Sequence, residues 1–146
     1  MSKRQRISTT TTITWKDTAN DNAEWDTSWD TNEVAICAVS EFGLPYPNSS
    51  FKIESIEFFG TGTVPSAANA PLIEIMIASD TSFTDVLYVG KGFYSTGKHS
   101  TTVCVSCFVV GQPVVLSNSD SLYITLKCAG SSALTGTSGR ITVSQE

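Results

Sequence analysis

The sequence has one histidine, few charged residues and no long apolar run. Charged residues make up 16% of the 146 positions, well below the roughly one quarter of an average domain. The single histidine, His99, lies in Gly97-Lys98-His99-Ser100, and no GxSxG-type nucleophile motif accompanies it. No segment reaches the roughly 18 apolar residues of a membrane helix, and no stretch has a convincing helical period. The sequence therefore predicts a β-domain that is not an enzyme.

The charge balance excludes two classes of partner. The net charge is -5, whereas a nucleic-acid partner requires a basic face and an anionic membrane attracts one. The basic tip of Lys3, Arg4 and Arg6 is too small to change this expectation, and we interpret it as a tail or a contact with an acidic neighbour. Because no apolar run follows it, the start does not resemble a secretory signal, and we expect synthesis in a reducing cytosol.

The four cysteines, Cys37, Cys104, Cys107 and Cys128, lie in apolar, strand-like runs. In a reducing compartment they are expected to be free, buried thiols. Cys104 and Cys107 have CxxC spacing, but an offset of three on a strand points side chains to opposite faces. With one histidine and no second CxxC, we expect no zinc site, no other metal and no cofactor.

Hydroxyl residues take the place of charged ones, since the chain has 20 Ser and 19 Thr. Together with β-branched and aromatic residues they favour strands and short turns. Apolar runs separated by turn clusters predict strands over residues 34–39, 51–59, 72–78, 86–89, 103–110, 114–116, 122–128 and 140–144, after a short run at 10–15. The predicted fold is all-β: an eight-stranded jelly-roll-like β-sandwich with an extended N-terminal arm.

Three local patterns refine this prediction. The run 51–59 changes phase, and a β-bulge near Ser55 would restore its register. The run 72–78 is apolar on nearly both faces, and Glu74 is its one charged residue. This pattern predicts a central strand that is covered on both faces, with a neighbouring subunit covering the second face. The Gly/Ser/Thr-rich stretch 129–139 is interpreted as a hairpin loop.

Two domains follow from composition: an extended arm over residues 1–33 and the jelly-roll domain over residues 34–146. The arm contains the sequence Trp-Lys-Asp-Thr once and the similar sequence Trp-Asp-Thr twice. These three motifs include all three tryptophans of the chain. A segment this polar should not order alone, so Trp15, Trp25 and Trp29 are predicted to contact a partner. On this interpretation, deletion of residues 1–33 leaves a folded domain that no longer attaches.

Acidic side chains offer two further candidate sites. The acids between Asp17 and Glu33 could attract calcium, but they lack the D-x-D-x-D-G pattern, and a solvated or docked arm is preferred. Glu54, Glu57 and Glu74 are the carboxylates that a glycosidase mechanism would need. We favour ion pairs or solvent contacts for them instead.

The stretch SDSLYITLKCAGSSALTGTSGRITV, residues 119–143, resembles the closing hairpin of jelly-roll capsid decoration (cement) and head-fibre proteins of tailed bacteriophages. The likeness covers residues 110–146 closely and the rest of the chain in its strand rhythm. It implies a structural virion protein, made in the host cytoplasm, that stabilises the phage head. The implied partners are the major capsid protein or neighbouring virion subunits, and the implied assembly is a homotrimer.

The alternative is a carbohydrate- or receptor-binding fibre-tip domain, in which Tyr46, Phe93 and Tyr94 would stack on sugar rings. A cupin-type enzyme is excluded because its metal site needs several histidines.

Overall fold

A computed structural model describes residues 6–17, 23–25, 28–62, 72–96, 103–128 and 134–146. Side chains are described for these residues except 17, 23–25, 60–62, 72, 93–96, 103–106, 128 and 134–137. Nine strands and one short 3-10 helix form this part of the chain. Their bounds are β1 Ile7–Asp17, β2 Ala23–Trp25, β3 Glu33–Ala38, η1 Val39–Phe42, β4 Ser50–Gly62, β5 Leu72–Ala78, β6 Val86–Thr96, β7 Val103–Val115, β8 Ser121–Cys128 and β9 Leu134–Gln145.

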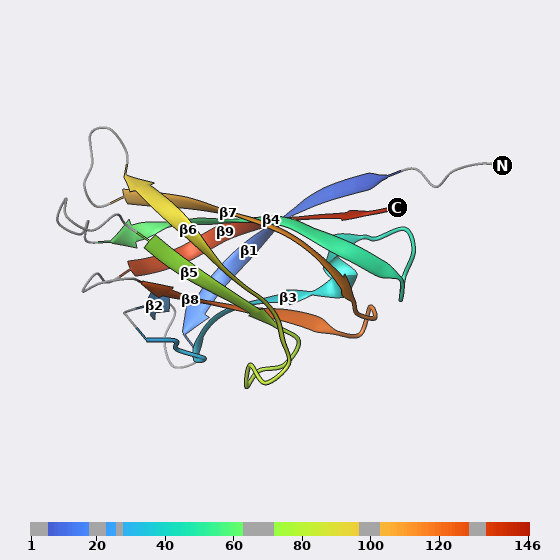
Figure 1. Ribbon diagram of the computed structural model, residues 1–146, viewed down its shortest axis with the longest axis horizontal. Helices are drawn as coiled ribbons and strands as arrows, with labels where there is room; N and C mark the ends of the chain where they lie inside the picture. Colours follow the sequence, from blue (N-terminus) through green and yellow to red (C-terminus); the bar gives the residue numbers. More distant parts are fainter. Residues whose placement is uncertain (1–5, 18–22, 26–27, 63–71, 97–102, 129–133) are drawn as a thin grey trace.

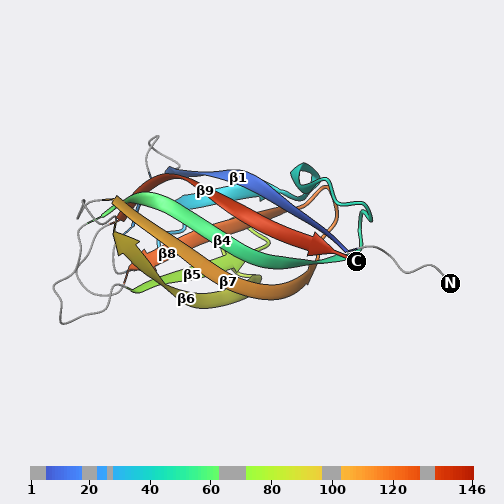
Figure 2. The same ribbon diagram turned by 90° about the horizontal axis from the view of Figure 1, so that it is seen from above.

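The strands form two antiparallel layers, seen one above the other in Figure 1 and from a second side in Figure 2. The first sheet has the order β1-β9-β4-β7 and the second has the order β3-β8-β5-β6. Consecutive strands among these eight lie in different layers, except β5 and β6, which are neighbours in the second sheet. This connectivity is that of two interlocked Greek keys. This is the strand order of a jelly roll, so the predicted fold class is confirmed. Strand β2 adds a short pairing to the start of β9.

Two strands join the layers at their corners. Strand β1 pairs with β9 over residues 7–14 and then with β3 over residues 15–17. Strand β6 pairs with β5 over residues 86–93 and then with β7 over residues 94–96. Because each corner strand changes partner along its length, the eight main strands form a closed circuit. Closure removes most of the unpaired sheet edge that would invite unwanted association.

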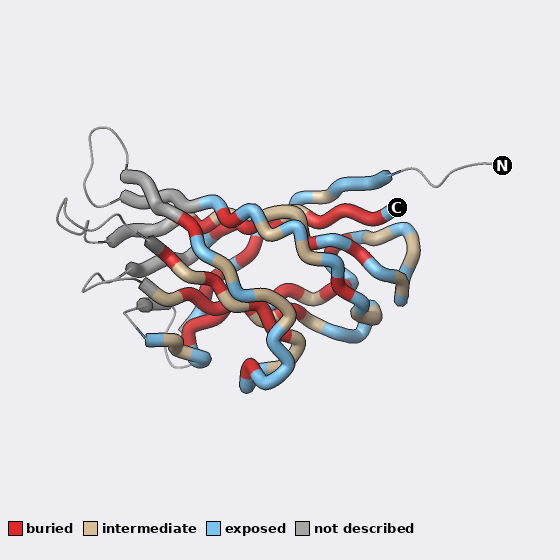
Figure 3. The backbone as a smooth tube through the Cα atoms, in the orientation of Figure 1, coloured by how far each residue is buried: buried red, intermediate tan, exposed pale blue. Residues whose placement is uncertain are grey.

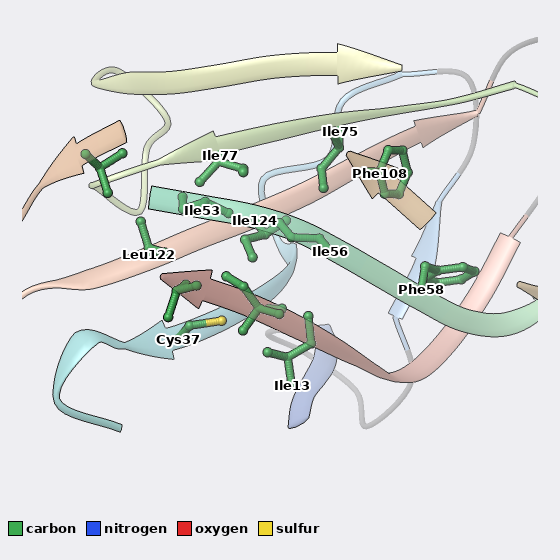
Figure 4. Close-up of a cluster of buried hydrophobic side chains, with 14 of the residues drawn as sticks. Ile13, Cys37, Ile53, Ile56, Phe58, Ile75, Ile77, Phe108, Leu122 and Ile124 are labelled. Carbon is green, nitrogen blue, oxygen red and sulfur yellow. The ribbon is translucent and has the colours of Figure 1, made fainter. Parts of the chain in front are cut away.

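The core lies between the layers and is built from alternate residues of the facing strands. Figure 3 shows buried backbone positions on both layers, and Figure 4 shows the side chains that meet between them. Ile53, Ile56 and Phe58 of the first sheet are fully buried, as are Ile75 and Ile124 of the second. The pleat of each strand sends the intervening residues to the outside, which gives both sheets an outer face.

Several sequence predictions are confirmed in detail. Strand β5 has the predicted bounds and is central, between β6 and β8. The register of β4 shifts between Ile53 and Ser55 against both neighbouring strands, which is the predicted bulge. Strand β8 buries Leu122, Ile124 and Leu126 on one face, as its alternation indicates.

The N-terminal boundary differs from the prediction. Residues 7–17, assigned to an extended arm, form β1 and pair with strands of both sheets. The hydroxyl run Ser8–Thr12 appears too polar for a strand only when it is considered alone. Strand β9 supplies its hydrogen bonds, and Ile13 and Trp15 reach the core. The β-domain therefore begins before residue 34.

Two further differences concern glycine-containing segments. The sequence predicts a loop over residues 129–139, yet residues 134–139 begin β9. There β4 pairs with them on one side, and β1 and β2 pair on the other. The predicted runs 103–110 and 114–116 form one strand, β7. Gly111 adopts a left-handed φ of 65° beside the register shift opposite the β4 bulge. Glycine allows the strand to continue through this irregularity.

Gly139 is expected to be intolerant of any side chain. A Cβ atom there would collide with the carbonyl oxygen of Glu57 and lie 3.1 Å from Nε1 of Trp15. Such overpacking typically costs about 1–3 kcal/mol. We expect Gly139→Ala to lower the free energy of unfolding by that amount in urea denaturation. Replacing the exposed neighbour, Ser138→Ala, serves as the control. Equal stabilities for the two variants would contradict the prediction.

Candidate functional site

Trp15 is a core residue. Its side chain is completely buried, and its indole N–H donates a hydrogen bond to the carbonyl oxygen of Ser138 at 3.1 Å. Its ring meets Phe58 edge to face, with the ring centroids 6.0 Å apart. The indole therefore attaches β1 to β9 and β4 and presents no surface to a partner, contrary to the expectation from the sequence.

Trp29 lies instead on the outer face of the second sheet, where it is half-buried. The Lys127 ammonium is 4.9 Å from its ring centroid, a cation–π distance. Nearby, the Thr125 hydroxyl lies 2.8 Å from the carbonyl oxygen of Asp30 and 2.9 Å from that of Glu33, and its single proton is shared between the two acceptors. Part of the predicted arm is thus folded against β8 of the same chain. A partner contact by Trp29 stays a prediction.

Trp25 lies in β2, where its backbone pairs with Leu134 of β9. Its side chain lies outside the described residues, so its predicted role in partner binding stays a prediction. The structure does not bring Trp15 and Trp29 onto one surface, because one side chain is inside the domain and the other is outside it.

The three candidate carboxylates are all paired with cations. Glu54 Oε1 accepts hydrogen bonds from the Ser144 hydroxyl at 2.6 Å and from Arg6 at 2.7 Å. The Ser144 hydrogen bond is the largest of the effects that lower the pKa of Glu54. Glu57 binds Arg140 at 2.7 Å. A general acid at neutral pH needs a raised pKa, so Glu54 has the opposite of the required environment.

Glu74 has cations on both sides across the sheet. Its carboxylate oxygens lie 2.8 Å from Lys127 Nζ and 4.0 Å from Lys91 Nζ. The three residues stand in one cross-strand row, because Glu74 is opposite Lys91 on β6 and Lys127 on β8. The contacts are internal to the chain, so the single charge of β5 does not require a neighbouring subunit.

Asp80 organises the turn between β5 and β6. Its carboxylate accepts hydrogen bonds from the backbone N–H groups of Thr84 and Asp85 and from the Thr84 hydroxyl. These bonds, led by the one from the Thr84 side chain, lower the pKa of Asp80. The Ser79 hydroxyl also binds the Asp85 carboxylate. The turn is therefore a defined structure with two carboxylates on its surface.

Other candidates are only partly described. His99, Lys3 and Arg4 lie outside the described residues, as does part of the acidic tract between Asp17 and Glu33. Within the described ranges, no group of three His, Cys, Asp or Glu side chains is placed to hold a metal ion. In the same part of the chain, no helix is long and apolar enough to span a membrane.

Two of the four cysteines are described, and both are free thiols. Cys37 is buried in the core, as expected, whereas Cys107 is exposed on β7, so the prediction that it is buried is wrong. Burial, with a smaller contribution from the charge of Glu41, raises the pKa of Cys37 to about 12. Desolvation, then the charge of Glu57, also raises the pKa of Cys107. Both thiols are therefore poor nucleophiles. The side chains of Cys104 and Cys128 lie outside the described ones, so the expectation for these two thiols stays a prediction.

Cys37 should make stability depend on pH in alkaline solution. Its pKa in the folded protein is about 12 against an ordinary 9.0, so the unfolded chain loses this proton first as pH rises. Stability is then lost above about pH 9, with a slope of at most about 1.4 kcal/mol per pH unit. Urea denaturation between pH 8 and 10.5 should show a steeper decline for the natural protein than for Cys37→Ala. Parallel curves would contradict the assignment.

Most of the exposed large apolar side chains lie on the outer faces of the two sheets. On β7 of the first sheet, Val109 is 82% exposed and Val115 is 73% exposed. On the second sheet, Ile36 of β3 and Val89 of β6 are more than half exposed, and Val86 is 42% exposed. These valine and isoleucine side chains give both outer faces some exposed apolar surface. The amino-acid sequence gives no local signal for these residues, because the face that each side chain occupies depends on the strand register.

A groove of about 200 Å³ lies where β1 and β3 diverge after their short pairing. Threonines 11, 12 and 14 of β1 line one wall, and Ile36 and Glu41 line the other. Ile13 and Cys37, which are both buried, also line the groove. Its lining contains neither a nucleophile with a lowered pKa nor a paired acid and base.

These features define the class of the molecule, a jelly-roll domain with apolar side chains on both outer faces. No protein-family model and no curated protein matches the sequence. Among solved structures, a chain of Desmodium yellow mottle tymovirus is similar, with a TM-score of 0.31 and 11% identity. The match covers 99% of this chain and 90% of that chain.

Proposed function

We propose that this chain is a structural virion protein, a decoration or cement protein of a phage head. The observation that carries the proposal is the exposed apolar surface on both outer faces of a closed jelly roll. Jelly rolls recur in viral capsid and lectin domains, and exposed apolar patches mark binding surfaces. The resemblance of residues 110–146 to phage decoration proteins supports the virion setting.

The mechanism is mechanical. A domain that binds a capsid shell at several equivalent positions adds buried area and avidity, and it changes no covalent bond. The partner would be the major capsid protein or a neighbouring virion subunit, and the chain would be made in the host cytoplasm before assembly. Since β1 belongs to the domain, attachment through a free arm over residues 1–33 is replaced by attachment through the sheet faces and Trp29.

Particles purified from infected host cells test this proposal. Quantitative mass spectrometry should find the chain at a fixed ratio to the major capsid protein, and electron cryomicroscopy should place it on the outside of the shell. Particles lacking it should open at a lower temperature in a thermal melt. If the chain is found only in the soluble lysate, it is not a virion component.

The alternative, a sugar-binding fibre tip, makes a different prediction in a glycan array, where specific binding would favour it. Of its three aromatic candidates, Tyr46 exchanges backbone hydrogen bonds with the Gln145 side chain at 2.9 and 2.8 Å. Phe93 and Tyr94 belong to β6, and their side chains lie outside the described residues. No described aromatic cluster therefore supports the alternative.

A further inference from the structure

One edge of β1 is open over the middle of the strand. Residues 7–14 pair with β9 on one side, and only residues 15–17 pair with β3 on the other. Figure 1 shows the two strands apart beyond this short pairing. Near the start of β1, the Thr9 hydroxyl donates to the Phe42 carbonyl oxygen at 3.2 Å, so η1 closes that end. Among the described residues, no strand pairs with this edge over residues 10–14.

The open edge offers backbone hydrogen-bonding groups to another chain. In an antiparallel pair, alternate residues direct both their N–H and their C=O away from the partner strand. Roughly two or three of the residues 10–14 therefore direct these groups into the seam between β1 and β3, over a length of roughly 17 Å. An extended polypeptide has donors and acceptors at the same spacing, and the addition of a strand to a sheet edge is a recurring mode of peptide recognition.

The edge of β1 lacks the features by which proteins protect open edges. Charged side chains, proline and bulges discourage pairing with other chains. Residues 7–15 contain no charged residue, proline or glycine, and five of them are threonine, a β-branched residue that favours strands. The register of β1 against β9 is continuous over residues 7–14, so no bulge interrupts the edge.

The open edge of β7, at the opposite corner of the domain, differs in each of these respects. Beyond its pairing with β6 at residues 104–106, β7 contains Gly111 with its left-handed φ of 65° and then Pro113. The Tyr88 hydroxyl lies 3.5 Å from the carbonyl oxygen of Val109. The edge of β7 is thus interrupted and partly covered, whereas the edge of β1 is continuous.

The groove between β1 and β3 supplies a pocket beside the open edge. It has a volume of about 200 Å³, and the buried Ile13 and Cys37 are among its lining residues. Ile36, which is 55% exposed, lines it from the β3 side. A small apolar side chain of an added strand would have these three residues as neighbours. Strand-addition sites combine main-chain hydrogen bonds with pockets for alternate side chains, and the seam has both elements.

Two charged residues of opposite sign line the groove. Lys16 lies at the end where β1 meets β3, and Glu41 lies beside Phe42, at the end that η1 closes. Neither forms an ion pair with another described residue. A strand antiparallel to β1 would begin near Lys16 and end near Glu41. An acidic residue early in that strand and a basic residue late in it therefore complement the groove.

We propose that the seam between β1 and β3 binds an extended segment of another protein, which pairs as a strand with residues 10–14 and places a small apolar side chain in the groove. Strands β1 and β3 are antiparallel, so an added strand can be antiparallel to only one of them. Strand β1 offers the longer open edge, and antiparallel pairing is the more stable kind. The site does not depend on the proposed virion role, because any protein with a free extended segment could supply the strand.

A library of random twelve-residue peptides displayed on phage particles is the probe, and the full chain is the immobilised target. Selection should yield peptides with alternating apolar residues. When a selected peptide binds, hydrogen exchange should slow at the backbone amides of residues 10–14 and should not change on β7. Replacing the residues of that peptide by proline one at a time should abolish binding at alternate positions, because proline has no N–H to donate.

Ile36→Lys places a charge at the wall of the groove and should raise the dissociation constant of the selected peptide at least about tenfold. The matched control is Val109→Lys on β7, which should leave the constant unchanged, and melting temperatures confirm that both variants are folded. A library that yields no binder, equal effects of the two variants, or a proline scan without alternation would overturn the proposal. So would self-association of the chain that Ile36→Lys abolishes, because the occupant would then be a second copy.

Discussion

A variant that lacks residues 1–33 is expected not to fold cooperatively. The deletion removes β1, which pairs with eight residues of β9 and three of β3, and it takes Ile13 and Trp15 out of the core. Strand β9 would then expose an unpaired edge, and the circuit of eight strands would be open. Because such domains are stable by only about 5–15 kcal/mol, we expect these losses together to unfold the domain.

Circular dichroism and urea denaturation measure this outcome. A variant lacking only residues 1–5 keeps the whole of β1 and is the matched control, which we expect to unfold cooperatively. The sequence alone led to the opposite expectation, that residues 34–146 fold without the segment before them. A sharp, cooperative unfolding transition of the 34–146 fragment would show that β1 is dispensable.

The second large effect is expected at Trp15. Replacing a fully buried large aromatic side chain by alanine typically costs about 3–5 kcal/mol. Trp15→Ala also removes the hydrogen bond to the Ser138 carbonyl oxygen and the contact with Phe58. We expect the midpoint of urea denaturation to fall sharply, and the variant could be unfolded at 37 °C if the domain is of ordinary stability.

Trp29→Ala is the matched control, since the same change is made on the surface. Its cation–π contact with Lys127 is partly exposed and is worth about 1 kcal/mol. We therefore expect a small loss of stability. If the two variants lose equal stability, the distinction between a core and a surface tryptophan is wrong.

The sequence predicted most of the individual strands because their signals are local. The alternation of Leu122, Ile124 and Leu126 determines which face of β8 is buried, and the phase change near Ser55 identifies the bulge. Both patterns lie within one strand. The apolar composition of residues 72–78 likewise placed β5 at the centre of its sheet.

The signals that were missed depend on partners far along the chain. Trp15 hydrogen-bonds to Ser138, which is 123 residues away, so its polar neighbours in sequence give no hint of burial. In the sequence alone, Gly139 is typical of a loop. Its role in β9, where the ring of Trp15 leaves no room for a side chain, becomes clear only from the structure. The exposed apolar side chains of the second sheet could not be predicted either, because the face that Ile36 and Val89 occupy depends on the order and register of the strands.

The pairing of β1 with β9 has a consequence for how the domain is made. Ile7 of β1 lies opposite Gln145 of β9. During synthesis on the ribosome, β1 is therefore made well before β9, its main pairing partner. Domains that are dominated by such distant pairings fold slowly. Until then, the apolar inner face of β1 and the edge of β4 that β9 will cover are open to other chains. The time between the synthesis of these two strands is therefore when the chain is most exposed to aggregation.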